Sequence, residues 1–300
     1  MRISTQQFYS QNLGNVQKGN AELFRLQEQL SSGKKISKPS DDPLAASQIK
    51  KLESSIARIE GYMRNVDMAE NRLTRVETTL DAVVDNLLRL KDLGVQISNG
   101  TLNDNDRKIV GAEFEQSLSQ LSGLLNTRDS EGESLFSGFR GQLDSYALNN
   151  EGNFEFQGDK GQRSLDLGDN IRIPITDSGA DIFGSGETNL LNTVKQMADA
   201  LNATPADMGA FDAQRGQLDQ YFEQAVVSRS QIGARLNVVQ EQREQLADLK
   251  FNTQSTLSKI QDTDYYEATS SLLLQQTALE ASYATFGKIQ GLSLFNFIGR

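Results

Sequence analysis

The chain has 300 residues, of which 40 are acidic and 30 basic, so its formal net charge at pH 7 is −10. This excess of carboxylates argues against a nucleic-acid or anionic-membrane binder, because both need a basic face. The chain contains no Cys, His or Trp, which excludes disulfides, thiolate nucleophiles, Cys/His zinc sites and histidine-based catalysis.

The first 32 residues predict a helix. Its apolar residues recur at the spacing of a coiled coil: Leu13, Val16, Leu23 and Leu30. Gly33 and Pro39 then interrupt the helix. An aspartate before a helix accepts a free backbone N–H, and proline fits the first helical position. We therefore predict that Asp41, Asp42 and Pro43 form the cap of the next helix.

Residues 43–98 continue as one helix, with apolar residues in steps of three and four. At 1.5 Å per residue such a helix is roughly 80 Å long, which predicts a rod. Asn103 or Asp104 caps a shorter helix that follows.

The composition changes after residue 128. Ten of the 24 glycines fall between Gly132 and Gly186. Residues 154–156, 165–167 and 171–175 alternate apolar and polar side chains, as half-buried strands do. We therefore predict a small β module at 129–188 that is inserted into the helical rod.

Helical patterns return at 188–202, from about 206 to 260, and again after Asp262-Thr263-Asp264. In the last helix Leu272, Leu279 and Phe286 are seven residues apart. The longest aliphatic run is Leu272-Leu273-Leu274, so we expect no membrane span.

The two ends carry too few large apolar residues to organise themselves. There are eleven in residues 1–40 and fourteen in 265–300. The free energy gained by burying them is smaller than the conformational entropy lost when both segments become ordered. We expect both ends to fray in the free chain and to become helical among neighbouring copies. The alternative is an ordinary monomeric bundle with adhesive ends. The predicted assembly interface consists of Ile3, Leu13, Val16, Leu23, Leu30, Leu272, Leu279, Phe286, Ile289, Leu292 and Phe295.

Two motifs resemble a catalytic or a metal-binding site, but neither is complete. Ser31–Lys34 matches S-x-x-K, but it has no companion motif and lies where a helix ends. Asp104 and Asp106 resemble the start of a calcium loop, but Lys108 occupies the next ligand position. The sequence therefore predicts no enzyme, no metal site and no cofactor.

Motifs at both ends resemble flagellin-type proteins, and in particular the hook-associated branch of that family. At the N-terminal end they are MRISTQ (1–6), QLSSGK (29–34) and KPSDDPLAAS (38–47). At the C-terminal end they are YYEA (265–268), QQTALEASY (275–283) and QGLSLF (290–295).

The resemblance implies a mainly α fold with a small β insert, a flagellin-like rod of long antiparallel helices. Residues 1–42 and 262–300 would form the assembly layer, 43–128 and 189–261 the rod, and 129–188 the outer module.

The resemblance also implies a structural adaptor of the bacterial flagellum. Such a chain would join a second hook-associated junction protein to flagellin and form a homo-oligomeric ring or tubular layer. It would leave the cell through the flagellar type III apparatus without a cleavable signal peptide, its C-terminal segment held beforehand by an export chaperone. The alternatives are flagellin itself or, in another class, a soluble coiled-coil interaction module.

Overall fold

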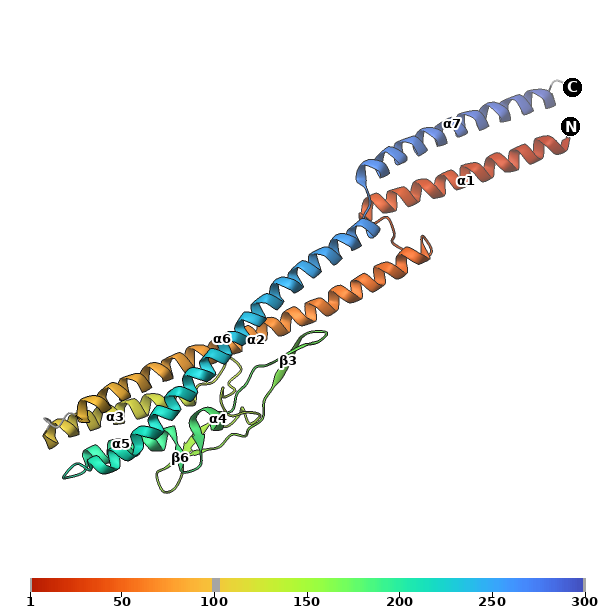
Figure 1. Ribbon diagram of the computed structural model, residues 1–300. Coiled ribbons are helices and arrows are strands. Elements are labelled where there is room, and N and C mark those ends of the chain that lie inside the picture. Colours follow the sequence, from red (N-terminus) through yellow and green to blue (C-terminus); the bar gives the residue numbers. More distant parts are fainter. Residues whose placement is uncertain (1, 99–102, 299–300) are drawn as a thin grey trace. The chain divides into compact units, whose positions relative to one another are not determined.

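The structure is a computed structural model that describes residues 2–98 and 103–298, with side chains for residue 7, 10–98 and 103–288. Most described residues are helical (Figure 1). The helices are α1 (Arg2–Ser32), α2 (Pro43–Ser98), α3 (Asp104–Leu125), α4 (Gly179–Phe183), α5 (Leu190–Asn202), α6 (Met208–Gln261) and α7 (Tyr265–Ile298). The predicted mainly α fold with a small β insert is confirmed, and α2 has the predicted limits.

The chain divides into two compact units, and the division falls inside α2 and inside α6. The terminal unit comprises residues 1–58 and 249–300, and the central unit comprises 59–248. The finer division into assembly layer, rod and outer module stays a proposal.

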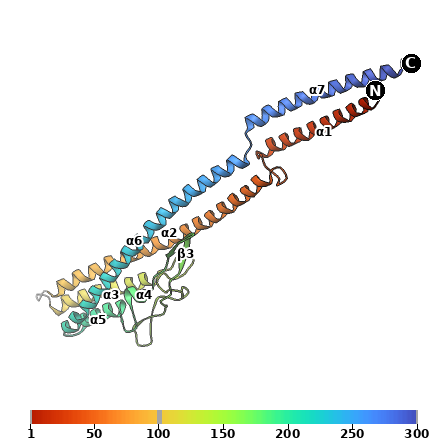
Figure 2. The same cartoon turned by 45° about the vertical axis from the view of Figure 1, so that its right-hand side comes forward.

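In the central unit α2 and α6 run antiparallel beside each other (Figures 1 and 2). Three ion pairs follow this arrangement along the two helices: Asp67–Arg243 (2.6 Å), Asp81–Arg229 (2.7 Å) and Lys91–Asp219 (3.0 Å). Beneath them Leu73, Leu80 and Leu87, spaced by heptads, are completely buried. The apolar stripe read from the sequence is therefore the core of this unit.

Helices α3 and α5 complete the core at the end of the central unit. Phe114 of α3 meets Phe211 of α6 edge to face, with ring centroids 5.7 Å apart. Asn103 forms a capping box at the start of α3, because its side chain accepts the N–H of Asp106 (3.0 Å) and the Asp106 carboxylate accepts the N–H of Asn103 (3.2 Å).

In the described part of the chain, six short strands form three antiparallel pairs. The pairs are β1 (Tyr146–Leu148) with β2 (Phe154–Phe156), β3 (Ser164–Gly168) with β4 (Ile171–Pro174), and β5 (Gly184–Ser185) with β6 (Thr188–Asn189). The predicted strands at 154–156, 165–167 and 171–175 are confirmed in β2, β3 and β4. Strands β1, β5 and β6 and the one-turn helix α4 were not predicted, because elements this short leave no periodicity to read.

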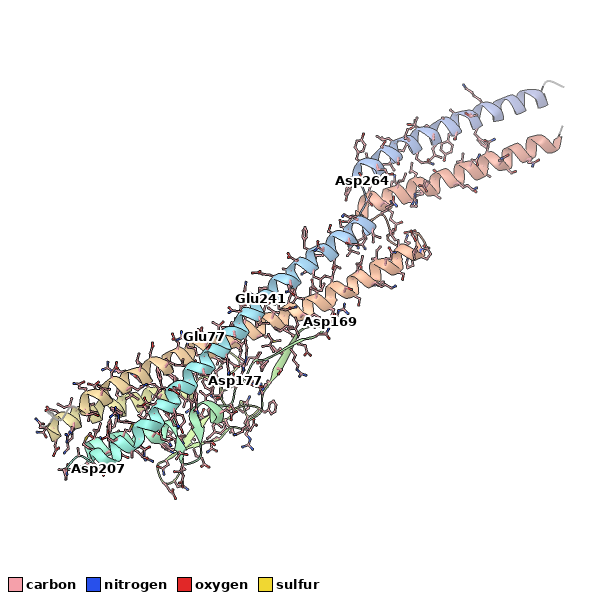
Figure 3. The ribbon with its side chains drawn as sticks, viewed as in Figure 1. Glu77, Asp169, Asp177, Asp207, Glu241 and Asp264 are labelled. Atoms are coloured by element: carbon pink, nitrogen blue, oxygen red, sulfur yellow. The ribbon has the colours of Figure 1, made fainter. Side chains whose placement is uncertain are left out.

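Polar contacts attach the strand-rich region to the long helices. The Asp177 carboxylate accepts two hydrogen bonds from Arg235 of α6, at 2.6 and 3.1 Å (Figure 3). Arg72 of α2 is buried between Asp129 and Glu133, and this burial lowers the pKa of its guanidinium while Asp129 opposes the shift. The buried Tyr146 hydroxyl donates to the carbonyl of Gly184 (2.6 Å), and its burial raises its pKa.

Candidate assembly surface

Helices α1 and α7 lie side by side and antiparallel within one chain (Figures 1 and 2). Leu26, Ala268 and Leu279 are the buried apolar side chains of this pair among the described residues. The backbone of Gly19 faces Leu279 so closely that an added Cβ would stand 2.9 Å from its Cδ2. An alanine at this position would therefore require the Leu279 side chain to shift.

Polar contacts fix the register of the pair. The Gln275 side chain donates to the carbonyl of Gly19 (3.1 Å), and the Asn20 side chain donates to the hydroxyl of Tyr283 (2.9 Å). These bonds reach across more than 250 residues of sequence. They show that the two ends of the chain recognise each other specifically.

The connectors that lead into α2 and α7 are joined by backbone hydrogen bonds. Thr263 N–H donates to the carbonyl of Gly33 (2.9 Å), and Lys35 N–H donates to the carbonyl of Gln261 (2.7 Å). Gly33 adopts φ = 70°, which only glycine tolerates easily, and the hydroxyl of Tyr265 lies against it. The junction is therefore a specific structure that connects the C-terminal end of α1 to the N-terminal end of α7.

Aspartates cap the helices on either side of this junction. Asp264 (labelled in Figure 3) accepts the N–H groups of Tyr266 (2.9 Å) and Glu267 (3.2 Å). Asp42 likewise accepts those of Leu44 and Ala45, both at 3.0 Å.

Asp41, assigned by sequence to the same cap as Asp42, accepts instead the N–H groups of Lys38 (3.0 Å) and Ser37 (3.3 Å). The bond from Lys38 is the main reason why the pKa of Asp41 lies below its ordinary value. Asp41 therefore shapes the connector, and Asp42 alone holds the first turn of α2.

The terminal unit leaves many large apolar side chains in solvent. Tyr266 is 88 % exposed, Leu274 70 % and Phe24 67 %. The other exposed members are Leu13, Leu44, Leu249, Phe251, Tyr265, Leu273 and Tyr283. Burying a leucine or phenylalanine side chain is worth about 1.5–3 kcal/mol, so these surfaces favour association.

The predicted interface residues divide into four groups. Leu279 is buried between α1 and α7 of one chain. Partly buried side chains belong to Val16, Leu23, Leu30, Leu272 and Phe286, whereas Leu13 is 44 % exposed. The side chains of Ile3, Ile289, Leu292 and Phe295 lie outside the described residues. Whether any of these residues contacts a neighbouring copy stays a prediction.

The most exposed apolar residues of α1 and α7 were not in the predicted interface. Phe24, Tyr266 and Leu274 do not fall on the heptad seam, which sequence reasoning selected as the contact face. Most described side chains of the seam are buried or partly buried within one chain, and the residues beside the seam stay exposed. An apolar residue next to a completed heptad stripe was the signal that could have found them.

The described residues hold no group of three or more Asp or Glu side chains arranged to bind a metal ion. Within the same residues, no helix is long and apolar enough to cross a membrane. The terminal unit presents an exposed apolar surface on two helices that hydrogen bonds hold together.

Two family models match this chain, the bacterial flagellin N-terminal helical region over residues 3–140 and the C-terminal helical region over residues 216–298. The chain belongs to the flagellin family. In this flagellin-family chain, α1 lies in the first matched region and α7 in the second, so the pair joins the two.

Within the flagellin family, full-length similarity extends to hook-associated members. Flagellar hook-associated protein 3 of Escherichia coli is 30 % identical over 314 residues, which covers 98 % of this chain and 99 % of that protein. Flagellin of Listeria innocua is 23 % identical, covering 93 % of each chain.

The crystal structure of flagellar hook-associated protein 3 from Legionella pneumophila superposes with a TM-score of 0.64. It is 19 % identical, and the match covers 71 % of this chain and 98 % of that one. The likeness in three dimensions shows the shared fold.

Proposed function

We propose that this chain is a structural adaptor of the bacterial flagellum, of the hook-associated protein 3 type, that joins the hook side to the flagellin filament. Its full-length match to the Escherichia coli protein of that name, at 30 % identity, carries the proposal. The role is mechanical, because what the geometry offers is helical surface for neighbouring subunits.

The terminal unit supports an assembling subunit. Its ten exposed large apolar side chains outnumber its five buried apolar ones among the described residues. A subunit of this kind gains stability when copies surround it. We propose a ring or tubular layer of identical copies, with a second hook-associated junction protein on one side and flagellin on the other.

We further propose that the chain is exported through the flagellar type III apparatus without a cleaved signal, and acts outside the cell as part of the flagellum. Before export a chaperone would hold the C-terminal segment. The exposed Leu273, Leu274 and Tyr283 of α7 give such a chaperone an apolar target.

A deletion strain tests the adaptor role. Without the adaptor, cells should make and export flagellin but release it unattached into the medium, and they should not swim. Bare hooks with no released filament protein would identify the chain as flagellin itself. A chain that stays in the cytosol, in cells that swim normally without it, would leave only a soluble coiled-coil module.

A further inference from the structure

The two units carry opposite net charge. The terminal unit has 13 basic and 9 acidic residues, a net charge of +4, whereas the central unit has 17 basic and 31 acidic residues, a net charge of −14. Complementary potentials steer association and fix which surfaces meet. In an assembly of identical copies, the terminal unit of one copy is thus attracted to the central unit of another.

The positive charge of the terminal unit gathers in residues 34–51, which we call the basic segment. It holds five lysines and two aspartates, and the aspartates are Asp41 and Asp42 of the connector and helix cap. Within the described part of the chain, Lys34, Lys35 and Lys51 form no ion pair. Leu44, seven residues before Lys51 and therefore on the same side of α2, is 72 % exposed.

A groove with the opposite character lies between α2 and α3 of the central unit. Its volume is 540 Å³, and its lining includes Asp85, Leu88 and Asp92. Arg89 also lines the groove, where its guanidinium forms an ion pair with Glu113 of α3 (2.8 Å). Both aspartates are exposed, and neither forms an ion pair among the residues that the structure describes. Leu88, between them on the helix, is 47 % exposed. We call this surface the acidic groove.

The two surfaces match in chemistry, since each presents an exposed leucine beside charged side chains of one sign that form no ion pair among the described residues. Lys51 and Asp85 are 34 residues apart on the single helix α2, which rises about 1.5 Å per residue. Their contact requires two copies.

We propose that the basic segment of one subunit docks on the acidic groove of a second copy of this chain, with lysines opposite Asp85 and Asp92 and Leu44 against Leu88. This contact rests on the proposed function, because it forms only in an assembly. It would select the neighbour by charge, and the apolar pair would exclude water from the contact.

A charge swap in the deletion strain tests the contact. The double variant Lys35→Glu/Lys51→Glu should lower the number of attached filaments about tenfold, because like charges then face each other. Adding Asp85→Lys/Asp92→Lys should restore attachment to within about twofold of the original. Unchanged attachment in the first variant, or no rescue by the second, would overturn the contact.

The same variants must fold for this result to count. None of the four side chains forms an ion pair among the residues that the structure describes, so circular dichroism of the purified monomers should match that of the unchanged protein. A variant with lost helicity is replaced by Lys35→Gln/Lys51→Gln, which removes the attraction without adding repulsion and should give a smaller loss of attachment.

Cross-linking identifies the occupant directly, because the chain has no cysteine of its own. In isolated hook–filament preparations, Lys51→Cys/Asp85→Cys should form disulfide-linked dimers and longer multimers of this chain. The control pair Lys51→Cys/Glu155→Cys places the second thiol on the exposed side of β2 and should give none. Links to another protein, or the absence of links in assembled material, would contradict docking between copies.

Failure of the contact and failure of the proposed function look different. If the unchanged chain is missing from isolated hook–filament preparations, the adaptor role is wrong. If the unchanged chain is present and attachment tolerates the charge reversal, the role stands and the contact is wrong.

Discussion

The terminal and central units differ in how they use apolar residues. Among the described side chains, the central unit buries 35 apolar residues and exposes ten large ones, whereas the terminal unit buries five and exposes ten. Hydrophobic burial is the main favourable term in folding, so the central unit has the means to fold alone. The terminal unit has specific contacts but little core, and we propose that it needs neighbours to become stable.

The largest expected effect lies in the central unit. Phe114→Ala removes a completely buried ring that packs on Phe211, so the free energy of unfolding should fall by about 3–5 kcal/mol. Chemical denaturation of the isolated chain, followed by circular dichroism, measures it. The matched change Phe24→Ala removes an exposed ring of the terminal unit. It should change the free energy of unfolding by less than about 0.5 kcal/mol.

Leu279→Arg tests the terminal unit in the same comparison. The change places a charge where α1 and α7 meet, against Gly19, so the variant should not be incorporated between hook and filament, although the central unit keeps its unfolding transition. Attached filaments and swimming provide the measurement, with the exposed neighbour change Glu280→Arg as control. Cells that carry Leu279→Arg and still swim would refute the role given to the pair.

Gly33→Ala should have an intermediate effect. An alanine at φ = 70° is strained by about 1 kcal/mol, and its Cβ would stand 2.9 Å from the Tyr265 hydroxyl. The junction between the connectors should loosen, which raises protease cleavage in residues 33–42 of the chain in isolated hook–filament preparations. Gly216→Ala, where an added Cβ meets nothing within 4 Å, is the control and should not alter cleavage there.

The smallest effect concerns pH in the strand-rich region. Asp159 accepts the N–H groups of Phe139 (2.9 Å) and Gly161 (2.7 Å), and these bonds hold its pKa below the ordinary value of 3.8. A lowered folded-state pKa gives stability that is present above the unfolded-state pKa and is lost as pH falls through the folded-state pKa.

Asp159→Asn should therefore slightly weaken the loss of stability that occurs as the pH falls below about 4. Unfolding curves at pH 3 and pH 7 measure this. An identical pH dependence in both proteins would show that the Asp159 carboxylate does not contribute.

Periodicity allowed the long elements to be predicted, because heptad spacing and caps are local signals. Helix α2 began at Pro43 as expected, and Asn103 caps α3. Contacts across great sequence distances could not be read in this way. Asn20 with Tyr283 and Asp177 with Arg235 depend on tertiary placement, which no window of sequence contains.

The candidate surface was predicted in part for a similar reason. The heptad seam of α1 and α7 was visible in the sequence, but a seam does not tell whether its partner is the same chain or another copy. The structure fills much of it within one chain, with Leu279 buried there. Exposure of Tyr266 and Leu274 depends on that pairing and could not be read beforehand.

Hydrogen exchange on the isolated, dilute monomer tests the central claim most directly. Amides in residues 1–40 and 265–300 should exchange fast, whereas those of α2 and α6 inside the central unit should be strongly protected. Slow exchange throughout α1 and α7 in the solitary chain would contradict the dependence of the terminal unit on its neighbours.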